Sequence, residues 1–344
     1  MAKPELKIKP INVALIGGET LLGRELQDVL QKSAEKTVIT GYASTGEGNF
    51  AEQEGEAIYL APLEAKAAVG YDAILLAGLT HEGALKSYEI AKAAKGHPLL
   101  IDCVGYLESQ PEARISSPLI AESGRDAGWL RIVAHPAATA MALVLTRLAN
   151  HAGLKMTIAH VFEPASERGK PAVSELHQQT TSLLAFKKIE KKIFDTQLTF
   201  NLLSQYGEDA PVKLSAVEQR IERHLATLLD KHAGIGPSHM PSVRLIQAPV
   251  FHGYSISLWL EFENMTSTAE IAGALASDRI DVRGEEHEPP EAVGAAGHSG
   301  IIAGDIRSDR NNSRAVWMWI TGDNLRLTSD AAAEIVGSLR CPAK

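Results

Sequence analysis

The chain has 344 residues, of which 45% are hydrophobic and 22% charged, and its formal net charge is −8. This acidic balance argues against a surface for nucleic acid or anionic membranes, because either would need clustered lysine and arginine. A chain of this length usually divides its core between two domains.

Features of a secreted or membrane-spanning protein are absent from the sequence. Residues 1–10 contain no apolar stretch typical of a signal peptide, and no run of about eighteen apolar residues follows. The two cysteines, Cys103 and Cys341, are too few for a disulfide framework and lack metal-ligand spacing. We therefore expect a cytoplasmic protein without a metal and without a membrane or nucleic-acid partner.

The first part of the chain alternates between predicted strands and helices. An apolar strand at 11–16 is followed by Gly17 and Gly18 and then by a helical pattern at 21–30. Further strands are predicted at 37–42, 57–60, 72–77 and 98–102, with a helix at 82–94. Strands that alternate with helices indicate a parallel sheet, and a strand, glycine turn and helix begin a dinucleotide-binding unit.

Beyond Pro136 the alternation stops, which indicates a mixed α+β domain. Helices are predicted at 139–149, 172–187, 214–232 and 328–340. Strands are predicted at 155–162, 197–203, 242–250, 255–261, 305–307 and 315–320. Trp317 and Trp319 would share one face of the last strand, which suggests core or a dimer surface.

Several short segments, in the correct order, resemble the aspartate-semialdehyde dehydrogenase family. Residues 132–141 (IVAHPAATAM) are similar to its active-site segment, I-x-x-N-P-N-C-[ST]-T. Residues 101–106, 249–255, 304–309 and 321–326 resemble its I-D-N-S-S-A, P-V-x-x-G-H-S, G-R-I-R-x-D and A-D-N-L-R-K segments. Within the family, residues 194–203 and 246–251 are most similar to the Usg-type group.

This resemblance implies an α/β fold with a Rossmann-type parallel-sheet domain (residues 1–134 and 325–344). An α+β substrate and dimerisation domain (residues 135–324) would follow, and the protein would be a homodimer. The family attacks aspartate β-semialdehyde with a cysteine thiolate, transfers hydride to NADP, and releases the product with phosphate.

The resemblance also places the family's catalytic groups on altered residues. The cysteine nucleophile aligns with Ala138, which has no lone pair to attack an aldehyde. The histidine base aligns with Tyr254, and a glutamine that orients the acyl intermediate aligns with Glu163. A tyrosine with an ordinary pKa of about 10 is a poor proton acceptor at neutral pH.

The family's anion-binding positions are altered as well. The arginine for the substrate carboxylate aligns with Gln247, and an arginine of the phosphate site aligns with Glu108. A phosphate-binding lysine aligns loosely with Glu218, although Arg220 lies nearby. Because cationic positions become neutral or acidic, a dicarboxylate-derived substrate and phosphate would both be disfavoured.

The cofactor turn departs from the family's G-A-T-G-x-V-G. Gly17, Gly18 and Gly23 are present, but Thr20 replaces the middle glycine and adds a Cβ where a phosphate would approach. Glu19 adds a negative charge at a helix N-terminus. The turn either keeps its shape without a ligand or binds a dinucleotide weakly. The loop at 42–49 has no arginine and contains Glu47, which favours NAD over NADP.

Two hypotheses follow from these substitutions. One is a catalytically impaired semialdehyde dehydrogenase homologue that acts by binding a partner. The other is an active NAD(P)-dependent oxidoreductase without a covalent intermediate, in which Tyr254 is a general acid. Cys103 is either a relocated nucleophile, with His135 or His252 as its base, or a small buried residue.

Overall fold

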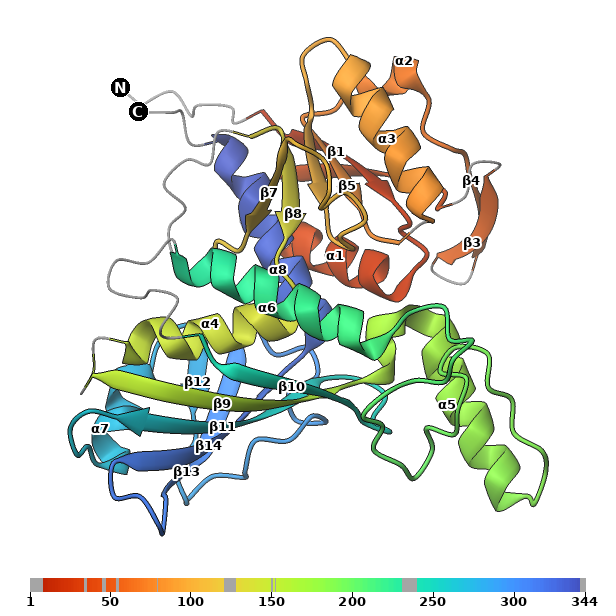
Figure 1. Ribbon diagram of the computed structural model, residues 1–344. Coiled ribbons are helices and arrows are strands. Elements are labelled where there is room, and N and C mark those ends of the chain that lie inside the picture. The colour runs from red at the N-terminus through yellow and green to blue at the C-terminus, as the bar shows by residue number, and fades with distance from the viewer. Residues whose placement is uncertain are drawn as a thin grey trace, which may run out of the picture. The chain divides into compact units, whose positions relative to one another are not determined.

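The computed structural model divides into two compact units (Figure 1). It describes residues 9–33, 36–44, 48–53, 56–78, 80–120, 128–149, 151, 153–230 and 240–340. The first unit comprises Met1–Pro118, Glu122–Val133 and Ser329–Lys344, and the second comprises Leu119–Ala121 and Ala134–Thr328. Each unit has its own six-stranded sheet.

The first unit is built on a parallel sheet with the strand order β2-β1-β5-β6-β8-β7. Its strands are β1 (Ile11–Ile16), β2 (Thr37–Tyr42), β5 (Ala73–Leu76), β6 (Leu99–Asp102), β7 (Ala113–Ser116) and β8 (Leu130–Val133). Its helices are α1 (Leu21–Lys32), α2 (Ala65–Ala68) and α3 (His81–Ala93). The four residues of β5 are buried, as expected for a central strand covered on both faces. The predicted Rossmann-type parallel sheet is confirmed.

One predicted strand of this unit lies outside that sheet. The segment at 57–60 forms β4 (Glu56–Leu60), which pairs antiparallel with β3 (Asn49–Gln53) in a separate two-stranded sheet. The sequence pattern identified β4 but missed β3, because periodicity indicates a strand without indicating which strand it pairs with.

The second unit contains a mixed sheet with the order β10-β9-β11-β14-β13-β12. Its strands are β9 (Leu154–Glu163), β10 (Ser242–Gln247), β11 (Tyr254–Phe262), β12 (Ile280–Val282), β13 (Ile301–Ser308) and β14 (Ala315–Gly322). Its helices are α4 (Pro136–Leu148), α5 (Gly169–Leu184), α6 (Leu214–Asp230) and α7 (Thr268–Leu275), with the 3-10 turn η1 (Ala165–Arg168). The predicted α+β class of this part is confirmed.

Helix α8 (Asn324–Gly337) begins in the second unit and enters the first at Ser329, and the turn η3 (Ser338–Arg340) follows it. Among the described residues, no helix combines the length and the apolar composition that a membrane span requires.

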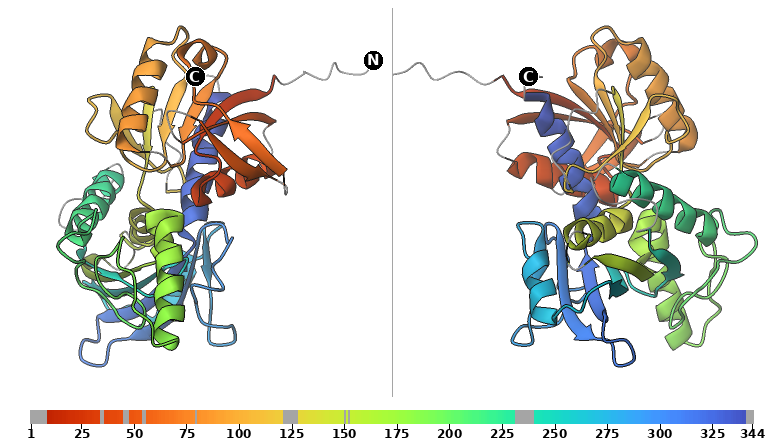
Figure 2. Two further views of the ribbon diagram at one scale, coloured as in Figure 1. Left: turned by 90° about the vertical axis from the view of Figure 1, so that its right-hand side faces the viewer. Right: turned by 60° about the vertical axis from the view of Figure 1, so that its left-hand side comes forward.

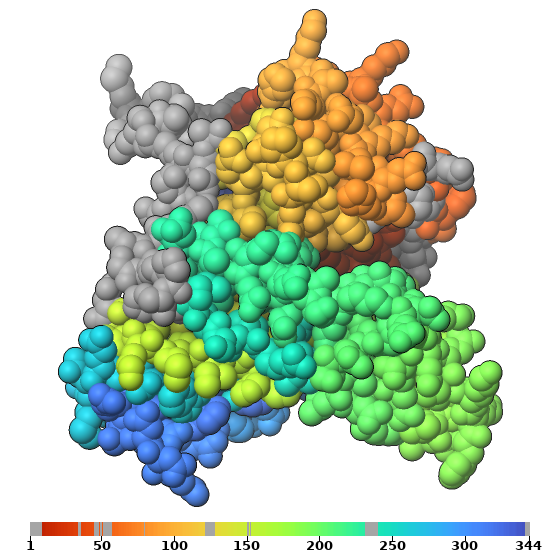
Figure 3. Space-filling model, in the orientation of Figure 1, coloured from red at the N-terminus to blue at the C-terminus, as the bar shows by residue number. Residues whose placement is uncertain are grey.

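The strand predicted at 197–203 is wrong. These residues belong to a loop that runs alongside α5 (Figures 1 and 2) and shares one continuous surface with it (Figure 3). The buried Gln179 side chain accepts hydrogen bonds from the backbone N–H groups of Leu198 (2.8 Å) and Thr199 (3.2 Å). It also donates to the carbonyls of Glu190 and Thr196. A side chain therefore satisfies the backbone groups that a strand ladder would otherwise use.

Glu175, one turn before Gln179 on α5, holds the preceding part of the same loop. Its carboxylate accepts hydrogen bonds from the backbone N–H groups of Lys192 and Ile193, both at 2.7 Å. Gln179 in turn donates to Glu175 at 3.2 Å. Two buried polar side chains of one helix thus determine the path of the loop that carries Tyr206.

Replacing Gln179 with alanine should destabilise the second unit. The substitution leaves two N–H groups and two carbonyls without their partner, and each buried unsatisfied group costs about 1–3 kcal/mol. Denaturant unfolding followed by tryptophan fluorescence measures this, because Trp259, Trp317 and Trp319 lie in the second unit. Gln178→Ala, at the exposed neighbouring position, is the matched control. Equal stability of the two variants would contradict the role assigned to Gln179.

Candidate functional site

Ala138 lies in the first turn of α4, and its side chain is fully buried. Pro136 occupies the start of this helix, where its missing N–H costs no hydrogen bond. His135 caps the helix, with Nδ1 accepting from the Ala137 N–H at 3.3 Å. A helix N-terminus would favour a thiolate at this position, but the residue offers a methyl group instead.

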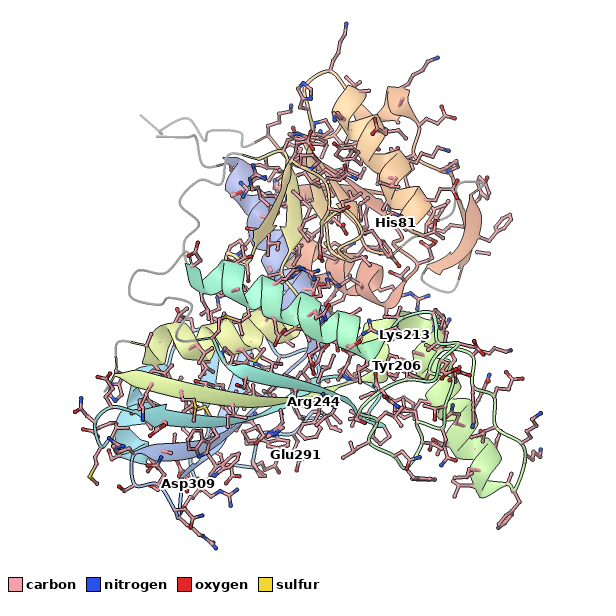
Figure 4. The ribbon with its side chains drawn as sticks, viewed as in Figure 1. His81, Tyr206, Lys213, Arg244, Glu291 and Asp309 are labelled. Atoms are coloured by element: carbon pink, nitrogen blue, oxygen red, sulfur yellow. The ribbon has the colours of Figure 1, made fainter. Side chains whose placement is uncertain are left out.

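Glu163 is the centre of a buried polar cluster at the end of β9. Its Oε1 accepts a 2.6 Å hydrogen bond from Nη2 of Arg168 and lies 3.3 Å from the Tyr206 hydroxyl. Its Oε2 accepts from the Tyr254 hydroxyl at 3.3 Å. Each of these side chains comes from a different segment: β9, η1, the loop before α6, and β11 (Figure 4 labels Tyr206).

Gln247 completes this cluster from β10, where it pairs in register with Glu163. Its Nε2 donates to the carbonyls of Glu163 (2.8 Å) and Ala248 (3.1 Å). Its Oε1 accepts from the Tyr206 hydroxyl at 2.6 Å. Both the oxygen and the nitrogen of the Gln247 amide are therefore hydrogen-bonded to other residues of the chain. These bonds give Gln247 a structural role.

Arg168 is the cation of the cluster, and the sequence analysis missed it. Its position on η1 brings a guanidinium to the carboxylate of Glu163, close to Gln247, which the sequence resemblance aligns with an arginine of the family. Among the described residues, none accepts a hydrogen bond from its buried Nε. The only sequence signal was the five-residue separation from Glu163. That spacing predicts a contact only if the chain turns at Pro164.

Burial controls the protonation of these groups. It raises the pKa of Glu163 to about 7, while the positive charge of Arg168 opposes this rise. Burial, together with the neighbouring Glu163, also raises the pKa of Tyr254 well above its usual value. Tyr254 therefore holds its proton at neutral pH and donates it to Glu163, so it cannot replace a histidine base.

His135 forms a second group of contacts beside Tyr254. The two rings lie edge to face with centroids 6.0 Å apart, and His135 Nε2 is 3.4 Å from Glu167 Oε1. The backbone N–H of His135 donates to Nδ1 of His224 at 2.9 Å. Burial, and after it the charge of Arg220, lowers the pKa of His135 well below its usual value, so the ring is neutral.

The two remaining anion-site positions have different surroundings. Glu218 on α6 accepts a 2.6 Å hydrogen bond from the backbone N–H of Leu245 and thereby supports β10. Glu108 is half-buried in the turn that follows β6, in the first unit. An acidic side chain at either position offers no positive charge to a phosphate.

The glycine turn of the first unit retains the geometry of a phosphate-binding turn. Gly17 has a φ of +85°, and a Cβ there would lie 2.4 Å from the carbonyl oxygen of Gly78. A Cβ on Gly23 would lie 2.1 Å from the carbonyl oxygen of Gly17, whereas one on Gly18 would meet only the flexible Gln27 side chain. A turn in this place, between the first strand and the first helix, is where dinucleotide-binding proteins hold the pyrophosphate.

Thr20 changes which donors this turn can offer. It is the N-cap of α1, and its hydroxyl accepts from the Gly23 N–H at 3.0 Å. The same hydroxyl lies 2.8 Å from the Gly17 carbonyl and 3.0 Å from that of Ala77. Because the cap uses the Gly23 N–H, one helix-terminal donor is no longer available to a phosphate.

The other candidates are less suited to catalysis. Burial raises the pKa of Cys103 well above its usual value, so the thiol is protonated, which disfavours its role as a nucleophile. His252 precedes β11, which begins at Tyr254, so the two residues do not share a strand face. Glu47 lies outside the described residues. No group of potential metal ligands occurs among those that are described.

We expect Glu163 to make stability depend on pH. Between its unfolded pKa near 4.5 and its folded pKa of about 7, the folded state holds a proton that the unfolded state has released. Stability should therefore fall as the pH rises through this window, by up to about 1.4 kcal/mol per pH unit. Glu163→Gln should lack this slope, while the exposed Glu208→Gln should keep it. Denaturant titrations from pH 5 to 8 test this, and parallel profiles for wild type and Glu163→Gln would contradict it.

Comparison with known proteins shows which family the chain resembles. The family model described as semialdehyde dehydrogenase, dimerisation domain, matches residues 145–327, just over half of the chain. An aspartate-semialdehyde dehydrogenase of Rickettsia bellii (strain RML369-C) is 25% identical over 341 residues, covering 92% of this chain and 94% of the relative. A USG-1 protein homolog of Pseudomonas aeruginosa is 34% identical over 175 residues, 51% of each chain.

The fold agrees with these sequence matches. The solved structure of a probable aspartate-semialdehyde dehydrogenase from Pseudomonas aeruginosa is similar with a TM-score of 0.81 and 25% identity. That similarity covers 97% of this chain and 99% of the other. From the family model and the similarity of the fold, we conclude that this protein belongs to the semialdehyde dehydrogenase family.

Proposed function

We propose that this protein is a semialdehyde dehydrogenase homologue that has lost the cysteine-dependent reaction and acts by binding. The observation that carries the proposal is the buried methyl group of Ala138 at the N-terminus of α4. A thioester intermediate needs a thiolate at this position, and the methyl group of an alanine cannot form one.

The surrounding charges support the same proposal. Glu163 and Arg168 form an internal ion pair at 2.6 Å, and Gln247 is bonded to the chain at both ends of its amide. A substrate carboxylate would have to displace Glu163 from the guanidinium. The displaced Glu163 carboxylate would stay in a buried site without its partner, which costs free energy. Binding of the substrate to a solvated arginine would not carry this cost.

A dinucleotide would be held by Gly17, Gly18, Thr20 and Gly23. Bound NAD or NADP supplies a hydride acceptor in this family. The cap formed by Thr20 uses the Gly23 N–H, so we propose that binding is weaker than with a glycine at that position.

The test is turnover of aspartate β-semialdehyde with phosphate and either NAD or NADP. We expect no reduced cofactor above background from the wild type or from Cys103→Ser, because neither has a nucleophile facing the substrate. An active aspartate-semialdehyde dehydrogenase assayed in parallel serves as the positive control. Mass spectrometry should detect no acyl-enzyme.

Two results would contradict this proposal in distinguishable ways. Turnover that disappears in Cys103→Ser would identify Cys103 as the nucleophile. Turnover that survives in that variant would instead favour the second candidate function. The double variant Ala138→Cys/Tyr254→His regains a thiol and an imidazole. An acyl-enzyme formed by this variant, with NAD or NADP as the hydride acceptor, would show that the site lost only its reactive groups; its absence would show that Gln247 and the Glu163–Arg168 pair also exclude the substrate.

The second candidate function is an oxidoreductase without a covalent intermediate. The observation that favours it is the hydrogen bond from Tyr254 to Glu163, whose pKa of about 7 allows proton exchange near neutral pH. Tyr254→Phe would remove this proton donor. Dinucleotide-dependent reduction of small aldehydes by the wild type, lost in Tyr254→Phe, would support this candidate.

We further propose a homodimer formed through one face of the second sheet. Trp317 on this face is 37% exposed, Trp259 and Trp319 are half-buried, and Trp319 stacks on Phe162 with centroids 5.8 Å apart. Asp309, labelled in Figure 4, accepts from the indole N–H groups of Trp259 and Trp317 at 2.9 Å. This holds both rings in place. An aromatic face of this kind on the matched dimerisation domain suits an interface between two copies.

Trp319→Asp should convert the dimer to a monomer, because it places a carboxylate in the middle of this apolar face. Light scattering coupled to size-exclusion chromatography measures the mass. Phe50→Asp, at an exposed aromatic residue of β3 in the first unit, is the control and should remain dimeric. A monomeric wild type, or a dimer that is unaffected by Trp319→Asp, would refute this interface.

A further inference from the structure

The guanidinium of Arg168 is incompletely hydrogen-bonded by the part of the chain that the structure describes. Its Nη2 donates to Oε1 of Glu163 at 2.6 Å, but none of the described residues accepts a hydrogen bond from its buried Nε. Nε and Nη2 form one edge of the planar guanidinium, and a carboxylate fits such an edge with both of its oxygens. Glu163 does not complete this pairing, because its Oε2 accepts from Tyr254 instead. Within the described part of the chain, half of the edge is therefore left for another acceptor.

Tyr206 lies beside this ion pair at the border of the cluster. Its hydroxyl is 3.3 Å from the Glu163 oxygen that pairs with Arg168, and it donates to Gln247 at 2.6 Å. The residue belongs to the loop between α5 and α6 (Figure 4) and is 8% exposed, whereas Glu163 and Gln247 are fully buried. The phenol of Tyr206 therefore separates the ion pair from solvent.

The loop holds Tyr206 in this position through contacts with Phe194. The two rings lie edge to face with centroids 5.4 Å apart, and the backbone N–H of Gly207 donates to the Phe194 carbonyl at 3.0 Å. Phe194 is itself fully buried, and its N–H donates to Glu175 at 3.4 Å. A substitution of the Tyr206 side chain therefore leaves the backbone contacts of the loop in place.

We propose that Arg168 is the cation of a binding site for small carboxylates and that the side chain of Tyr206 blocks this site. This goes beyond the proposed loss of thioester chemistry, because it names a ligand that the chain excludes and the residue that excludes it. The ligand would accept the Nε–H of Arg168 with one oxygen and share Nη2 with the other. An alanine at position 206 would leave a space of about one phenol ring beside the guanidinium, open where Tyr206 now meets solvent.

A second carboxylate beside Glu163 requires that one negative charge is neutralised. Burial raises the pKa of Glu163 to about 7, against the opposing charge of Arg168, so this carboxyl can take up a proton near neutral pH. The other charged and titratable groups that face it are Glu167 on η1, Tyr206 on the loop and Tyr254 on β11. Both tyrosines hold their protons, because burial raises the pKa of each. Binding of an anion should therefore be coupled to protonation of Glu163, and the affinity should fall as the pH rises through this range.

The test is isothermal titration of the full chain with succinate at pH 6.5 and at pH 8. The wild type and Tyr206→Phe, which both keep the ring, should show no saturable binding. Tyr206→Ala should bind succinate, and more tightly at pH 6.5 than at pH 8. Adding Arg168→Lys to Tyr206→Ala should weaken this binding at least about tenfold, because lysine keeps the charge but lacks the guanidinium edge. Phe200→Ala, at a 63% exposed aromatic residue of the same loop, is the matched control and should behave like the wild type.

Three outcomes would overturn the proposal. A wild type that binds succinate as tightly as Tyr206→Ala would show that the ring does not block the site. A folded Tyr206→Ala that binds no succinate, or an affinity that Arg168→Lys leaves unchanged, would show that Arg168 is not the cation of such a site. Circular dichroism checks the fold of each variant. Tyr206→Val, which keeps more of the packing against Phe194, should also bind succinate and keeps the test decisive if the alanine variant does not fold. None of these results bears on Ala138, so the proposed loss of thioester chemistry stands or falls separately.

Discussion

The buried ion pair between Glu163 and Arg168 is the interaction on which the second unit's site depends. A charge buried without a partner costs several kcal/mol, so each of these groups requires the other. The tyrosines extend the pair: Tyr254 donates to the second oxygen of Glu163, and Tyr206 joins Glu163 to Gln247. Glu163, Gln247 and Tyr254, three of the positions that the family resemblance singles out, thus belong to one hydrogen-bonded unit.

Glutamate carboxylates accept hydrogen bonds from other segments elsewhere in the chain as well. Glu175 accepts the backbone N–H groups of the loop beside α5, Glu218 accepts one from β10, and Glu19 accepts two donors from Ser44. In each case a carboxylate of the chain satisfies donors of another segment. Charged acceptors form stronger hydrogen bonds than neutral ones, which makes glutamate effective for this purpose.

Fold and chemistry are separable in this protein. The parallel sheet, the glycine turn and the mixed sheet persist, since they depend on buried apolar strands and on glycines such as Gly17 and Gly23 that no larger residue can replace. The proposed loss of the reaction concerns a few side chains, and each can differ without disturbing a strand. The family's architecture is therefore compatible with a different role for the site.

The sequence by itself determined the fold class of both units and indicated which positions differ from the family's motifs. Apolar strands of the right length, a glycine turn before a helix and short segments in family order sufficed to predict both sheets and to identify Ala138, Glu163, Gln247 and Tyr254. These features are local, so they can be read from adjacent residues.

Only the tertiary structure decided what those positions contact. The contacts of Arg168, Tyr206 and Glu19 could not be predicted from adjacent residues, because their partners lie on other segments of the chain. The segment at 197–203 has the composition of a strand, yet it became a loop because Gln179, nineteen positions before Leu198, takes its N–H groups. Hydrogen bonds between distant segments depend on how the chain folds back on itself, and periodicity carries no information about that path.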